Sequence, residues 1–217
     1  MKRPTATLAT VVRPRIPAAP PGPWGAVAAA ASQVQHWAHG AEGRRRTGRE
    51  LRKLDAAGWQ VKHRIEVSGG VTVDHLAIGP SGVYVLDSRA WAGVVTVDHK
   101  GATITPKNDP GAAWTAYGHH RMLPPAAAAV VRRLAAVTGA RIRAPRAVVV
   151  IWAAFPERVA VSGSLTYVAG EHLARWLSDQ PRQLDERQLS ALSAVSISGR
   201  VPTQRSSTQG NRSLVLG

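Results

Sequence analysis

Two aspartates and an arginine lie close together in the stretch VDHLAIGPSGVYVLDSRAW, which runs from residue 73 to residue 91. Asp74 and Asp87 lie in two apolar segments on either side of the turn GPSG, and Arg89 follows two residues later. Mg²⁺ prefers oxygen ligands and often uses only one or two carboxylates together with a substrate phosphate. A guanidinium group can hold such a phosphate through two hydrogen bonds. These residue types therefore suit the metal-assisted hydrolysis of a phosphodiester.

A β-hairpin would bring the two aspartates together. Side chains alternate between the two faces of a strand, and a four-residue GPSG loop would pair Ile78 with Val83. The same register places Asp74 opposite Asp87, on a face with apolar neighbours. Like charges in opposite positions are unfavourable, so Arg89 or a bound divalent cation must offset the repulsion. The alternative is a surface hairpin with salt-bridged carboxylates and no metal.

A basic helix is predicted before this hairpin. The segment GAEGRRRTGRELRKLDAAGW (40–59) favours a helix from about Glu42 to Ala57 that ends at Gly58. Arg44 shares the face of Leu51, which the helical spacing predicts to be buried. The basic side chains of this helix are the best candidates for phosphate contacts, and a solvated helix face is the alternative. The candidates are Arg44, Arg45, Arg46, Arg49, Arg52 and Lys53.

The remaining elements alternate between strands and helices. Strands are predicted at 59–67, 93–98, 102–105 and 146–154, with two short ones at RVAV and LTYV. Residues 106–118 are predicted to be a loop that leads into a helix at 124–139, which has Pro at its start and Gly at its end. Further helices are predicted at 170–179 and 185–195. This order predicts an α/β fold: a single domain with a central mixed β-sheet flanked by helices.

Composition separates the ends of the chain from its middle. Residues 1–23 are basic and rich in Pro, and residues 197–217 are rich in Ser, Gly and Arg, so both are predicted to be disordered tails. A helix or linker is predicted at 24–39, the folded domain at 40–181, and a possible C-terminal helix at 182–196. The sequence contains no cysteine, which excludes disulfides and thiolate metal sites.

The formal charge of +15 indicates an anionic partner. The excess of basic residues extends into the predicted folded domain and favours nucleic acid, with an anionic membrane next and a general compositional bias as the alternative. No apolar segment is long enough to span a bilayer, and the start lacks the apolar core of a signal peptide. The chain is therefore expected to be cytoplasmic.

The quoted residues resemble the nuclease-related domain family, NERD. The resemblance rests on GAEG with its basic helix, on GW at 58–59, on VDHLAIGPSGVYVLDS and on AW at 90–91, and it extends from about Gly40 to Asp179. It implies a restriction-endonuclease-like fold of the PD-(D/E)xK superfamily, with Mg²⁺ as cofactor and DNA more than RNA as partner. The implied site contains Asp74 and Asp87 as metal ligands and Arg89 as the third catalytic position.

Two positions depart from the pattern that this resemblance implies. Arg89 stands where a lysine is expected, and Arg44 stands where a glutamate of the helix is expected, with Glu42 as the alternative if the match slips. Arginine can hold a phosphate but stays protonated, so it cannot act as a base. The chain is therefore either an active nuclease, a degenerate Mg²⁺-dependent phosphodiesterase, a non-catalytic DNA- or RNA-binding module, or an interaction scaffold.

Other side chains with chemical potential are interpreted as structural. His75 points to the face opposite Asp74 and is expected to be a buried histidine. His119 and His120 lie near a loop–helix junction, and because adjacent side chains diverge on a helix, they are not expected to bind one metal together. The aromatic rings of Trp114 and Tyr117 are candidates for stacking on bases, with packing against the protein as the alternative.

Overall fold

The structure is a computed structural model of the chain and describes residues 40–67, 71–143 and 145–195. The predicted tails at 1–23 and 197–217 and the predicted helix or linker at 24–39 lie outside the described residues. Within the described ranges, no helix combines the length and the apolar character needed to cross a membrane.

A mixed six-stranded sheet forms the centre of the fold, in the order β1-β2-β3-β7-β9-β8. Strands β1, β2 and β3 pair antiparallel, β7 lies parallel to both β3 and β9, and β8 runs antiparallel to β9. This arrangement confirms the predicted α/β fold with a mixed sheet. The strands are β1 (Gln60–Val67), β2 (Val71–Gly79), β3 (Gly82–Arg89), β7 (Arg146–Ile151), β8 (Val159–Ser162) and β9 (Leu165–Ala169).

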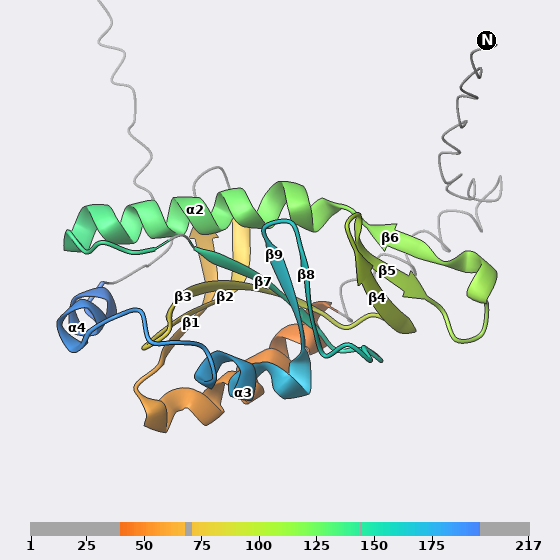
Figure 1. Cartoon of the computed structure of the whole chain (residues 1–217), viewed down its shortest axis with the longest axis horizontal. Coiled ribbons are helices and arrows are strands. Elements are labelled where there is room, and N and C mark those ends of the chain that lie inside the picture. Colours follow the sequence, from red (N-terminus) through yellow and green to blue (C-terminus); the bar gives the residue numbers. More distant parts are fainter. Residues whose placement is uncertain (1–39, 68–70, 144, 196–217) are drawn as a thin grey trace, which may run out of the picture. The chain divides into compact units, whose positions relative to one another are not determined.

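Helices cover both faces of the sheet (Figure 1). One face carries α2 (Gly118–Thr138). The other face carries the helix at 40–51 with its 3₁₀ continuation η1 (Arg52–Ala57). The same face also carries η3 (Gly170–His172) and α3 (Leu173–Ser178). The short helix α4 (Glu186–Ser193) begins with a capping box at Asp185 and lies within the segment predicted as a C-terminal helix.

Two hydrophobic cores follow from this layering. Val149 and Ile151 of β7 pack on the side of α2, whereas Val148 and Val150 pack with Leu51 on the other side. A strand buried on both faces needs apolar side chains at every position, which explains the continuous apolar run in this segment.

The structure differs from the prediction after β3. The expected hairpin forms as β4 (Val94–Asp98) and β5 (Gly101–Thr105), but with β6 (Trp114–Ala116) it builds a separate three-stranded sheet. Residues 106–118 were expected to be loop, yet they contain β6 and the 3₁₀ turn η2 (Pro110–Ala112). A strand of three residues is too short to display an alternating pattern, which is why the sequence did not indicate it.

The long helix α2 also begins earlier than predicted, at Gly118 rather than at Pro124. Pro124 and Pro125 lie inside the helix, although proline usually marks the first turn because it lacks an N–H donor. Burial of Leu123 and Ala126 against the sheet stabilises the helix on both sides of the prolines. The earlier start places His119 in the first turn of α2.

Candidate functional site

The two aspartates lie where β2 and β3 separate. The β2–β3 register is the predicted one, with Ile78 opposite Val83, and the last pair is His75 with Leu86. Asp74 and Asp87 are the next residues in each strand, and by alternation both face the side of α2. The Oδ2 atom of Asp74 accepts a hydrogen bond from the backbone N–H of Ser88 at 2.8 Å. Beyond the last backbone pair, the side-chain carboxylate of Asp74 therefore links the two strands.

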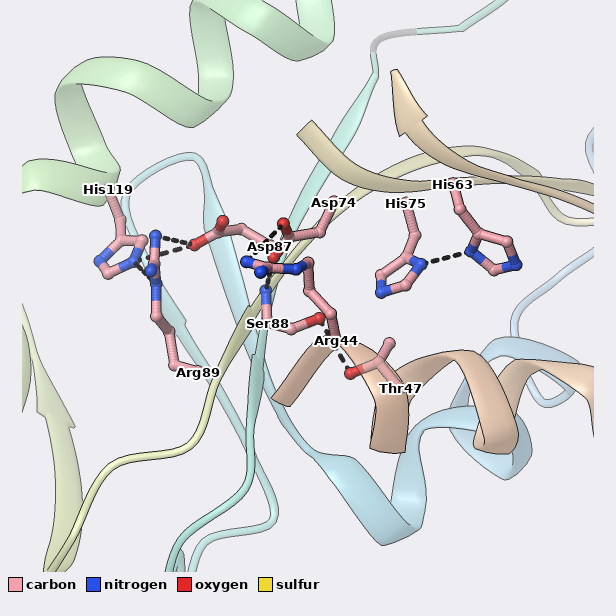
Figure 2. A network of polar contacts seen from close by, with 9 residues as sticks. All are labelled: Arg44, Thr47, His63, Asp74, His75, Asp87, Ser88, Arg89 and His119. Carbon is pink, nitrogen blue, oxygen red and sulfur yellow. Dashed lines mark hydrogen bonds and ion pairs between the residues drawn. The ribbon is translucent and has the colours of Figure 1, made fainter. Parts of the chain in front are cut away.

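Arg44 reaches Asp74 from the helix at 40–51. Its Nη1 atom lies 3.7 Å from Asp74 Oδ1 (Figure 2). The buried Thr47 fixes this helix on the strand, because its Oγ1 atom accepts hydrogen bonds from Ser88 Oγ at 2.9 Å and from Trp152 Nε1 at 2.8 Å. Gly43 assists, since a Cβ atom there would lie 3.3 Å from the backbone nitrogen of Ala90.

Arg89 and His119 occupy the other carboxylate. The Oδ2 atom of Asp87 lies 2.6 Å from Arg89 Nη2 and 3.1 Å from His119 Nε2, and Arg89 Nε donates to the same ring nitrogen at 2.8 Å (Figure 2). A neutral His119 ring accepts from Arg89 through this nitrogen, whereas a protonated ring donates to Asp87 through it. This nitrogen therefore bonds to Arg89 or to Asp87, and the protonation of the ring decides which.

The two carboxyl groups respond differently to this environment. Burial raises the pKa of Asp74 to about 6, and the charge of Asp87 adds to the effect, while the Ser88 N–H and Arg44 oppose it. Burial also acts to raise the pKa of Asp87, but the contacts with His119 and the charge of Arg89 outweigh it and lower this pKa. At neutral pH both groups therefore carry negative charge, and two guanidinium groups balance them.

The donor set suits a hard divalent cation. Among the described residues, Asp74 Oδ1 has only the 3.7 Å ion pair, whereas Asp87 Oδ2 contacts Arg89 Nη2 at 2.6 Å and His119 Nε2 at 3.1 Å, which leaves Asp87 Oδ1. Each carboxylate thus retains an oxygen for coordination, and Mg²⁺ needs no more than one or two such ligands from a protein. No group of three potential metal-binding side chains occurs among the described residues. A metal here would depend on the aspartate pair, with Arg44 and Arg89 competing for the same oxygens.

The predicted basic cluster divides into residues that line a cleft and residues that do not. A cleft of about 490 Å³ opens beside Arg44, between the helix at 40–51 and β1, and no acidic side chain of the described residues lines it. Arg46 instead lies 4.3 Å above the Trp152 ring, and Lys53 pairs with Glu50 at 2.7 Å. The cationic side chains that line the cleft are Arg44, Arg45, Arg49, Arg52 and Arg64.

Two histidines complete the wall of this cleft. His63 and His75 place their Nδ1 atoms 2.6 Å apart, on the side of Arg44 that faces away from His119 (Figure 2). Arg64, beside His63, has a φ angle of 54°, which residues other than glycine rarely adopt. His75 is buried, as expected, and burial lowers its pKa to about 4, with the charges of His63 and Arg44 adding to the effect.

The structure brings Asp74, Asp87, Arg89 and Arg44 into one site, and it adds His119. His119 was not predicted as a site residue, because the expected helix start at Pro124 left it at the loop–helix junction and not in a helical turn beside Asp87. Glu42, the alternative to Arg44, lies elsewhere, with Oε2 2.7 Å from Arg45 Nη2 and Oε1 3.9 Å from Arg49 Nη2.

One comparison with known proteins gives a match to a family over part of the chain. The sequence model of the NERD family, the nuclease-related domain, matches residues 39–134. The matched range contains the helix at 40–51, the hairpin with both aspartates and the first turns of α2. No curated protein and no solved structure matches the chain.

Proposed function

We propose that the protein binds nucleic acid, DNA more than RNA, at a degenerate Mg²⁺-dependent phosphodiesterase site, because residues 39–134 match the nuclease-related domain family. Asp74 and Asp87 are the metal ligands in this proposal. The observation that supports it is the pairing of each carboxylate with a guanidinium group, Asp74 with Arg44 and Asp87 with Arg89. Both arginines compete with a metal and attract phosphate, which weakens cleavage but favours binding.

The proposed mechanism divides the work between these side chains. A Mg²⁺ ion held by Asp74 and Asp87 would polarise a phosphoryl oxygen. Arg89 leaves Asp87 for the substrate and holds the scissile phosphate through its fork of N–H donors. Arg89 stays protonated and cannot take a proton from water, so His119 is the group beside Asp87 that is able to do so.

Calorimetric titration with Mg²⁺ and with Mn²⁺ tests the metal site. We expect weak binding that disappears in Asp74→Ala, and a Kd that falls about tenfold in Arg44→Ala, because a positive charge about 4 Å from the ligand is removed. Arg45→Ala is the matched control, since Arg45 contacts Glu42 and not the aspartates. Equal effects of the two arginine variants would contradict the role of Arg44.

Cleavage assays then measure how degenerate the site is. Arg89→Lys restores the lysine that the family pattern implies, so we expect it to increase the cleavage of a labelled DNA in the presence of Mn²⁺. Asp87→Ala should abolish any cleavage that the wild type has. Cleavage by the wild type at the rate of Arg89→Lys would show that Arg89 does not weaken the site.

A non-catalytic nucleic-acid-binding module is the second candidate, and the basic cleft favours it. Five arginines line this cleft, with no acidic side chain among the described lining residues, so phosphates can bind there whether or not a metal is present. This candidate predicts DNA binding that weakens steeply with salt and does not respond to Mg²⁺. The calorimetric result for the wild type separates the two candidates.

A further inference from the structure

A second cavity lies beside Asp87, and its walls differ from those of the basic cleft. It has a volume of about 190 Å³ and borders β2, β3 and the first turns of α2. Asp87, Arg89 and His119 supply polar groups to its lining. The other walls are mainly apolar and are formed by Val73, Met122, Leu123 and Ala126. An apolar chamber with a few polar groups at one side suits a flat, uncharged ring that has polar atoms on its edge.

Exposed apolar side chains concentrate in the segment that leads into α2, whose first turns border this cavity. Five large hydrophobic residues are exposed in the described part of the chain, and three of them fall between residues 114 and 122. Trp114 is 43% exposed, Tyr117 is 54% exposed and Met122 is 60% exposed. This concentration of exposed apolar side chains within nine residues indicates contact with an apolar ligand.

The rings form a continuous row that leads to the cavity. Trp114 contacts Trp91 edge to face, with ring centroids 6.1 Å apart, and Trp91 contacts His119 in the same way at 5.8 Å. His119 lines the cavity and touches Asp87. Arg89, with 39% of its side chain exposed, lies beside the same ring and provides a positive charge next to the apolar surface.

We propose that this cavity holds the base of an unpaired nucleotide whose phosphate rests on Arg89, and that the domain therefore selects single-stranded nucleic acid. The inference rests on the proposed function, because it specifies the substrate class of the same site. A base in a duplex is stacked and paired, and its removal from the stack costs free energy. A single strand offers its bases without this cost, and aromatic rings such as Trp114 bind them in a sequence-tolerant manner.

Fluorescence anisotropy with three labelled probes tests this selection. The probes are a single-stranded oligonucleotide, a duplex of the same length, and a single strand with abasic positions that retains every phosphate. EDTA in the buffer prevents cleavage. We expect the single strand to bind most tightly and the abasic strand to bind roughly tenfold more weakly, because stacking is lost while the phosphate contacts remain.

Two exposed positions, one in the aromatic row and one in the cavity wall, can be changed without disturbing the core. Trp114→Ala and Met122→Ala should each weaken single-strand binding at least fivefold and leave duplex binding unchanged. Val137→Ala, at an exposed position near the other end of α2, is the matched control and should change neither. A third variant, Ala126→Leu, fills the cavity and should also reduce the preference for the single strand.

The outcomes separate this inference from the proposed function. Equal binding of the intact and the abasic single strand, or of single strand and duplex, would overturn the inference and leave nucleic-acid binding in place. No effect of Trp114→Ala and Met122→Ala would overturn it in the same way. Absence of binding to all three probes at low salt would overturn the proposed function and the inference with it.

Discussion

The substitution Asp74→Asn should stabilise the protein at neutral pH. Burial and the neighbouring Asp87 raise the pKa of Asp74 from 3.8 to about 6, so the folded state favours the protonated carboxyl group. The stability that this preference provides is fully present below pH 3.8, and it is lost as the pH rises through about 6. Asparagine is neutral throughout and retains an oxygen that can accept the hydrogen bond from Ser88.

The size of the effect follows from the shift in pKa. Each pKa unit corresponds to about 1.4 kcal/mol, so a shift of this size sets an upper limit of about 3 kcal/mol. The Asp74 side chain is 14% exposed and Arg44 screens part of its charge, which reduces the expected gain to about 2 kcal/mol at pH 7.5. At pH 3.5 we expect no difference between Asp74→Asn and the wild type.

Urea unfolding, followed by tryptophan fluorescence from pH 3.5 to pH 8 in EDTA, measures this difference. Asp55→Asn serves as the control, because Asp55 is an exposed residue of η1 and should show no comparable gain. A gain for Asp74→Asn that is equal at pH 3.5 and pH 7.5, or no gain at pH 7.5, would refute the reasoning. In either case the charge of Asp74 would not destabilise the folded protein, and a metal would have no such repulsion to relieve.

Three further predictions follow from the contacts in the site. Thr47→Val should lower the free energy of urea unfolding by about 2 kcal/mol, because Ser88 and Trp152 each lose a buried hydrogen-bond partner; an unchanged value would contradict the anchoring role of Thr47. Arg49→Ala and Arg64→Ala should each reduce the slope of log Kd for DNA against log salt concentration by about one, whereas Arg132→Ala, on α2 and outside the cleft, should not change it. Mn²⁺ should bind more tightly when a non-cleavable oligonucleotide is present, because phosphates that engage Arg44 and Arg89 release the aspartates; reciprocal calorimetric titrations should give the same factor in both directions, and the absence of coupling would contradict the competition.

Local sequence patterns determined most of the architecture. The alternation of apolar residues and the GPSG turn predicted the β2–β3 register, because the side-chain period of two links the loop length to every pair. The same alternation placed Asp74 and Asp87 on one face. The apolar run at 146–154 predicted a strand covered on both sides. These features depend on contacts between near neighbours in the sequence, which a single chain displays directly.

The aspartate pair and its two arginines could also be proposed from the sequence, because Arg89 lies in the hairpin and Arg44 lies on the helical face of Leu51. The pairing of Arg44 with Asp74 and the presence of His119 beside Asp87 could not be predicted. His119 is 32 residues away from Asp87, and the prolines at 124 and 125 concealed the helical turn that carries it. The sequence also did not show which basic side chains of the helix at 40–51 and η1 face the cleft. Arg46 instead stacks on Trp152, and Lys53 pairs with Glu50.

The sequence by itself thus determined the layered α/β fold, the hairpin and the residue types of the site. Only the tertiary structure decided that β2 and β3 separate at the aspartates, that His119 and Arg89 share Asp87, and that an apolar cavity adjoins the charged groups. The physical reason is that strand pairing and helical periodicity are local, whereas the ionisation and contacts of a buried carboxylate depend on side chains from four segments that meet only in the folded chain.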